Sequence, residues 1–150
     1  MDKSKPQIRI ELIKKVNAAF INQFNGLLDE GTEWDLQEGA KFLEDSSNAL
    51  FVAFFENQAV GFLTANRLQR FDKRGAEVLL YEIGVREDAR QKGIGKALIR
   101  EVKLWAKETG VDEVWVLTNR SNTAAVALYQ SMGGETESET PDEVMFNFKF

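Results

Sequence analysis

Hydrophobic and polar residues alternate with a period of two in some segments of the chain and recur at helical spacing in others. Residues 8–12 alternate and predict a strand, whereas residues 16–28 and 36–42 have helical spacing. Residues 50–55 and 59–65 are apolar runs separated by a short polar stretch, which predicts a β-hairpin. The first half of the chain is therefore expected to form a strand, two helices and a hairpin.

In the second half of the chain, strand and helix patterns follow one another. Residues 77–85 and 114–117 predict strands, and apolar residues recur at helical spacing over 94–106 until Gly110 ends that helix. A last strand is predicted for residues 143–150, where valine and phenylalanine alternate with other residues. This order predicts an α/β (α+β) domain with a mixed, mostly antiparallel sheet and flanking helices.

The segment between the strand and the helix has the composition of an anion-binding loop. The strand ends near Val85, and Gly93 and Gly95 let an anion approach bare backbone at the start of the helix. Unpaired amides and the helix dipole favour phosphate there. A P-loop is excluded because the spacing G-x-x-x-x-G-K-[ST] is missing, and a dinucleotide fingerprint is excluded because Leu98 replaces its third glycine. Two glycines that merely open a helix are the alternative interpretation.

Composition limits both the size of the fold and the chemistry available to it. With 150 residues, of which 43% are hydrophobic, the chain can bury one sizeable core, so a single domain over residues 1–150 is expected. The absence of cysteine and histidine excludes a thiolate nucleophile, a Ser-His-Asp triad and a Cys/His zinc site. We expect no metal site, so catalysis has to use carboxylates, tyrosine, lysine, backbone amides and water.

Hydropathy and charge indicate the compartment and the kind of partner. No apolar run is long enough to span a membrane and no signal peptide is present, so a cytoplasmic protein without a membrane partner is expected. The net charge is −5, and acidic residues gather in residues 29–38 and 135–143. These clusters suit a cationic substrate, although such clusters are most often solvated surface. No nucleic-acid partner is expected, because phosphate binding would require a basic stripe.

A second motif lies after the strand predicted at residues 114–117. It has the pattern N-x-x-A-x-x-L-Y-x-x-x-G, formed by Asn122, Ala125, Leu128, Tyr129 and Gly133. Tyr129 lies about two helical turns after Asn122, so the two side chains face the same way. Together with the loop Arg90-x-x-Gly93-x-Gly95, this motif resembles the GCN5-related N-acetyltransferase (GNAT) family.

The resemblance implies that acetyl-CoA is the cosubstrate, and it also implies where acetyl-CoA binds. Two parallel strands, ending near Val85 and Leu117, are expected to splay apart and to accept pantetheine like an added strand. The backbones of Ile83 and Val85 would hold pantetheine, and the loop amides would hold the pyrophosphate. The full set of expected acetyl-CoA contacts is Ile83, Val85, Arg90, Gln91, Lys92, Gly93, Ile94, Gly95, Lys96 and Asn122.

The resemblance also implies direct attack of a substrate amine on the bound thioester, assisted by two catalytic residues. Glu82 is expected to take a proton from the substrate ammonium and, as a strand residue, to point to the face opposite Tyr81 and Ile83. Tyr129 is expected to donate a proton to the leaving thiolate. The alternatives are a salt-bridged or edge-exposed glutamate and a core tyrosine.

Within the family, residues 81–85, the loop and helix after them, and residues 142–148 are most similar to the small aminoglycoside 3-N-acetyltransferases. Glu82 replaces their aspartate, and Gly133-Gly134 replaces a frequent Gly-Phe. The expected acceptor is a small-molecule cationic amine such as an aminoglycoside. A protein or peptide N-acetyltransferase and a non-catalytic acyl-CoA-binding sensor are the alternatives, and a homodimer is an alternative to a monomer because dimers are common among similar proteins.

Overall fold

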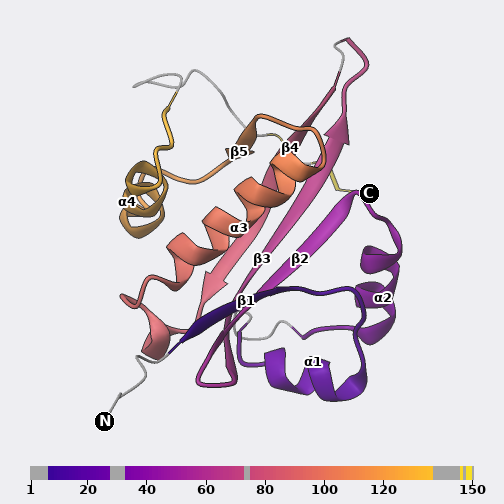
Figure 1. The fold of residues 1–150 in the computed structure, drawn as a ribbon, viewed down its shortest axis with the longest axis vertical. Coiled ribbons are helices and arrows are strands. Elements are labelled where there is room, and N and C mark those ends of the chain that lie inside the picture. The colour runs from indigo at the N-terminus through magenta and orange to yellow at the C-terminus, as the bar shows by residue number, and fades with distance from the viewer. Residues whose placement is uncertain (1–6, 28–32, 73–74, 137–145, 147, 150) are drawn as a thin grey trace.

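The computed structural model describes residues 7–27, 33–72, 75–136, 146, 148 and 149 (Figure 1). Its strands are β1 (Ile8–Leu12), β2 (Asn48–Phe55), β3 (Gln58–Gln69), β4 (Ala76–Val85) and β5 (Val114–Val116). Its helices are α1 (Ala18–Phe24), α2 (Leu36–Glu44), α3 (Ile94–Glu108) and α4 (Thr123–Ser131), and a short 3-10 turn covers Glu87–Ala89. The strand predicted for residues 143–150 lies largely outside the described residues.

The five strands of the described chain form one sheet in the order β1-β2-β3-β4-β5 (Figure 1). The first three pairings are antiparallel and the last, between β4 and β5, is parallel, which confirms the mixed, mostly antiparallel sheet. The parallel pairing covers only residues 78–80 and 114–116, although β4 continues to Val85. The two strands therefore separate beyond Leu80, as expected for the splayed pair.

Helices cover both faces of the sheet, and this explains why β2 and β3 read as continuous apolar runs instead of alternating strands. Helix α3 lies across one face (Figure 1), where Leu98 belongs to a buried cluster with Phe51 and Leu63. On the other face, Phe24 of α1 belongs to a second cluster with Phe62, to which α2 adds apolar side chains. Each face of the central strands is thus buried against a helix.

The predicted hairpin is confirmed, and its turn is Glu56-Asn57. Both residues have positive φ angles, 50° and 65°. This backbone suits a two-residue hairpin turn, because it follows the right-handed twist of the flanking strands. Strand β3 extends beyond its predicted end to Gln69, since residues 66–69 still pair with β4 although most of them are polar.

Helix α1 is shorter than the pattern of residues 16–28 predicted. Asn17 has extended backbone, with φ at −138°, and its side chain accepts a 2.8 Å hydrogen bond from the amide of Phe20. This capping bond starts the helix at Ala18. Helix α2, in contrast, runs past its predicted end to Glu44.

The packing of α3 gives a first prediction. Leu98 is fully buried (0% exposed), so Leu98→Ala should lower the free energy of unfolding by about 2–5 kcal/mol, because a cavity remains between helix and sheet. Leu104, on the same helix, is 48% exposed and provides the matched control. Leu104→Ala should change stability by less than about 0.5 kcal/mol. Urea unfolding measures both, and equal losses would contradict this packing.

Candidate functional site

A β-bulge at Tyr81 is the feature of β4 on which the site depends. Thr64 of β3 pairs with Glu82, but its neighbour Ala65 pairs with Leu80, so Tyr81 is an extra residue without a partner. Leu80 and Ile83 consequently both pack with the cluster beneath α3. Glu82 lies on the opposite face from Ile83, as predicted. The strict alternation predicted through Tyr81 was wrong, because the bulge interrupts it.

Beyond the bulge, none of the described strands pairs with one edge of β4. Hydrogen-bonded and non-hydrogen-bonded pairs alternate along antiparallel strands, and the amide of Arg86 donates to the carbonyl of Val60 at 2.8 Å. Gly84 and Glu82 lie two and four residues before Arg86, so their backbone N–H and C=O groups also face β3. Ile83 and Val85 fall between them, so their N–H and C=O groups point to the side that β5 does not reach.

The loop before α3 presents a row of free amides. Gly93 is the N-cap of α3 with a left-handed backbone (φ 82°), and no side chain caps the helix. Gln91 is also left-handed, at φ 64°. Within the described part of the chain, no amide of residues 91–96 donates a hydrogen bond. Free amides at the N-terminus of a fifteen-residue helix are suited to binding an anion, and the anion contact itself stays a prediction.

The two glycines of the loop have different roles. A Cβ atom at Gly93 would meet nothing within 4 Å, so glycine is needed there for its positive φ. A Cβ atom at Gly95 would lie 3.0 Å from Cδ2 of Leu128 in α4. Gly95 was predicted to admit an anion to the backbone, but the structure adds a packing role, because it lets α4 approach the start of α3.

The two loop cations contact backbone carbonyls of their own segment. Arg90 Nε donates to the carbonyl of Val85 and Lys92 Nζ donates to the carbonyl of Asp88, each at 3.2 Å. The Lys92 ammonium also lies 5.8 Å from the centre of the Phe55 ring. Both side chains are exposed and keep further N–H groups for an anion, so their contact with phosphate stays a prediction.

A cleft of about 380 Å³ opens where β4 and β5 separate. Its lining comes from the end of β4, from β3, from the end of β5 and the residues after it, from α4 with its N-cap, and from the segment after α1: Leu27, Phe62, Leu80, Tyr81, Glu82, Ile83, Gly84, Val116, Leu117, Thr118, Asn122, Ala125 and Tyr129. Four predicted site residues, Glu82, Ile83, Asn122 and Tyr129, thus meet in one cleft. Val85 and the loop residues are not part of its lining. Sequence reasoning did not identify the wall formed by Leu27 and Phe62, which come from distant segments.

Glu82 supplies the negative charge of the cleft. Of the residues that line the cleft, Glu82 is the one with a charged side chain, and this side chain is exposed. Its Oε2 atom accepts a 3.2 Å hydrogen bond from the hydroxyl of Thr64. The sequence did not single out Thr64, because the register that brings it opposite Glu82 depends on the bulge.

Tyr129 lies in the cleft on α4 and is half-buried. Burial raises the pKa of its phenol above the ordinary value, so the group keeps its proton at neutral pH. The helix ends just after it, where the Gly134 amide donates 2.9 Å to the Tyr129 carbonyl and Gly133 is left-handed. A Cβ atom at Gly134 would lie 2.9 Å from that carbonyl oxygen, so the second glycine keeps this turn close.

Asn122 begins α4 as its N-cap. Its Oδ1 atom accepts a 3.1 Å hydrogen bond from the amide of Ala125, as expected for a capping asparagine. The cap orients the helix so that Asn122 and Tyr129 both line the cleft, which confirms that they share a face. A contact between Asn122 and a cosubstrate stays a prediction.

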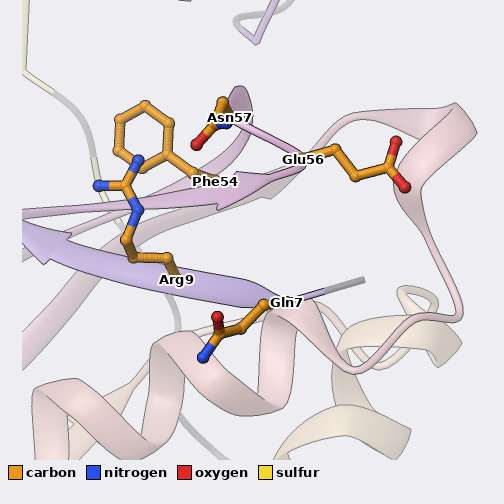
Figure 2. Close-up of a pocket in the computed structure, with 5 residues that line it drawn as sticks. All are labelled: Gln7, Arg9, Phe54, Glu56 and Asn57. Atoms are coloured by element: carbon orange, nitrogen blue, oxygen red, sulfur yellow. The ribbon is translucent and has the colours of Figure 1, made fainter. Parts of the chain in front are cut away.

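A second, smaller depression of about 220 Å³ lies at the turn between β2 and β3, and Figure 2 shows the side chains that line it. Its lining is Gln7, Arg9, Phe54, Glu56 and Asn57. The Arg9 guanidinium lies 4.4 Å from the centre of the Phe54 ring and pairs with Glu11. None of the predicted site residues belongs to this depression. The cleft at the end of β4 is therefore the candidate active site.

Among the described residues, no cluster of three or more potential metal ligands occurs. In the same part of the chain, no helix has the length and apolar character needed to cross a membrane.

The chain matches the acetyltransferase (GNAT) family over residues 14–134. N-acetyltransferase 8 of Homo sapiens is 34% identical over 92 residues, which are 61% of this chain and 40% of that protein. N-acetyltransferase family 8 member 3 of Mus musculus is 32% identical over 99 residues, 66% of this chain and 44% of that protein. The chain thus spans less than half the length of these relatives.

Solved structures share the fold over nearly the whole chain. The aminoglycoside N-acetyltransferase AAC(6')-Iy in complex with CoA superposes with a TM-score of 0.80 at 25% identity, covering 99% of both chains. The same protein with the bisubstrate analogue CoA-S-monomethyl-acetylneamine gives a TM-score of 0.78 at 27% identity, covering 96% of this chain and 99% of that one.

Proposed function

The chain belongs to the acetyltransferase (GNAT) family, and we propose that it transfers an acetyl group from acetyl-CoA to a primary amine in a ternary complex. The observation that carries this proposal is the edge of β4 with which no described strand pairs, which leads from the bulge to the row of free amides before α3. The described strands share one sheet, which supports a single catalytic domain over residues 1–150.

Acetyl-CoA fits the chemistry of this edge. Pantetheine contains two amide groups, and the backbones of Ile83 and Val85 would pair with them as a neighbouring strand would. The amides of residues 91–96 would hold the pyrophosphate, with Arg90 and Lys92 adding charged contacts. Asn122 lies across the cleft and would contact the cosubstrate from α4. When bound, acetyl-CoA supplies a thioester that an amine can attack.

The side chains of the cleft would move the two protons that amide formation requires. An amine attacks only when it is deprotonated, so Glu82 would accept a proton from the substrate ammonium. Tyr129, whose phenol stays protonated at neutral pH, would donate its proton toward the departing sulfur. The amide of Val85 or of a neighbour would stabilise the negative charge that develops on the acetyl oxygen.

A small cationic amine is the proposed acceptor, with an aminoglycoside as the first candidate. The carboxylate of Glu82 in the cleft and the net charge of −5 both favour an ammonium group. The likeness to an aminoglycoside N-acetyltransferase supports the same class, while acetylation at the 3-amino group stays a prediction. Release of free CoA with a panel of aminoglycosides, polyamines and peptides separates a small-molecule enzyme from a peptide enzyme. A binding protein without turnover would indicate a sensor.

Binding of acetyl-CoA should stabilise the fold, because its contacts are absent from the unfolded chain. At a concentration one hundred times its Kd, the free energy of unfolding should rise by about 2.7 kcal/mol. Gly93→Ala should reduce this gain, since alanine disfavours the left-handed backbone that aims the loop amides. Gly26→Ala is the matched control, because Gly26 has open space around it and no positive φ. Thermal melts that respond to NAD or ATP but not to acetyl-CoA would contradict the assignment.

Glu82→Gln should lower kcat by about 10²–10⁴-fold and leave acetyl-CoA affinity nearly unchanged, because it removes a general base without altering the cosubstrate path. The loss should shrink as the pH rises, since more of the amine is then deprotonated without help. The rate of CoA release across pH, together with acetyl-CoA titration, measures both effects. A mutant with the wild-type pH profile would assign Glu82 to structure or simple binding.

Tyr129→Phe should lower kcat by about 10²-fold or more, with little change in acetyl-CoA affinity or Tm. The phenol donates late in the reaction, so it matters more to the transition state than to the bound ground state. Steady-state kinetics and a thermal melt of the mutant test this. Wild-type turnover under conditions where chemistry limits the rate would exclude Tyr129 as the acid, and a joint loss of activity and several degrees of Tm would favour a core tyrosine.

A further inference from the structure

We propose that Thr64 is a positioning residue that holds the Glu82 carboxylate in the orientation that receives the substrate ammonium. This inference rests on the proposed role of Glu82 as base. The Thr64 hydroxyl donates to Glu82 Oε2 at 3.2 Å. Among the described residues, no other side chain donates a hydrogen bond to this carboxylate.

The bulge creates this contact. Before the bulge, β3 and β4 pair in the register of Ala65 with Leu80, and a continuation of it would place Thr64 opposite Tyr81. The extra residue shifts the register, so Thr64 instead lies opposite Glu82 on the same face of the sheet. The two residues form a hydrogen-bonded pair, in which the Cα atoms lie about 5.5 Å apart.

The neighbours of Thr64 on the same face of β3 do not donate a hydrogen bond to Glu82. Phe62 is apolar and packs in the cluster beneath α1. The Asn66 amide is engaged elsewhere, since Nδ2 donates to Asn48 Oδ1 at 2.7 Å. Thr64 is therefore the donor that this face of β3 offers to the carboxylate.

The chemistry of a threonine suits a positioning role. A β-branched side chain on a strand is restricted at χ1, so the hydroxyl is held in a narrow range of directions. A carboxylate has two oxygens, and with Oε2 bound to Thr64 the other oxygen stays available for the amine. The 3.2 Å distance is long for an O–H···O bond, and catalytic hydrogen bonds commonly shorten when substrate binds.

The first test compares Thr64→Val, which removes the hydroxyl at equal shape, with Thr64→Ser, which keeps it. Thr64→Val should lower kcat by about five- to tenfold with the acetyl-CoA KM and the Tm unchanged, as expected for loss of a hydrogen bond to a charged group. Thr64→Ser should restore most of the rate. Thr109→Val is the matched control, because its hydroxyl bonds the Ala106 carbonyl at the end of α3, outside the cleft. It should leave kcat unchanged.

The decisive test is a double-mutant cycle with Glu82→Gln. If Thr64 acts through the carboxylate, Thr64→Val should have no further effect on kcat in the Glu82→Gln background. An equal loss in both backgrounds would overturn the inference, as would wild-type turnover of Thr64→Val. Wild-type turnover of the Glu82→Gln single mutant would overturn the proposed base and this inference together, and that result is distinct because it appears without any change at Thr64.

Discussion

Every buried backbone amide and carbonyl needs a hydrogen-bond partner. Among the described strands, β4 has a strand partner on both edges only as far as Leu80. Beyond that residue, β3 still pairs with one edge, while β5 ends at Val116, opposite Leu80. The separation leaves a cleft between two strands that remain anchored in the same sheet. A ligand with amide groups can complete the ladder there, so the incomplete sheet is the source of the proposed binding site.

The β-bulge at Tyr81 and the end of the pairing with β5 occur at the same place on β4. Together they determine which side chains and backbone groups of β4 face the cleft. The bulge puts Glu82 on the face of Thr64, while Ile83 stays on the face of α3. Gly84 then lies against Phe62, where a Cβ atom would come within 2.7 Å of the ring. This close approach permits no side chain at Gly84 without movement of Phe62. Packing on one face thereby keeps the strand in position for the backbone contacts proposed at its other edge.

Much of this site could be predicted from the sequence, because local patterns carry the relevant information. Gly93 marks a helix start, and Asn122 and Tyr129 lie on one helical face whatever the rest of the chain does. The bulge at Tyr81 and the contact between Gly95 and Leu128 could not be predicted in this way. They depend on register and on packing between segments that are distant in the sequence, to which hydrophobic periodicity is insensitive. Thr64 was missed for the same reason.

The two proposed catalytic side chains differ in their surroundings as their roles require. Glu82 is exposed, so its carboxylate is open to water. Tyr129 is half-buried on a helix whose ends are fixed by the Asn122 cap and by the turn at Gly133, and burial raises the pKa of its phenol. The proposed base is thus open to solvent, and the proposed acid is partly shielded from it. Both side chains line the cleft beside the end of β4, so an exposed carboxylate and a half-buried phenol meet in one cleft.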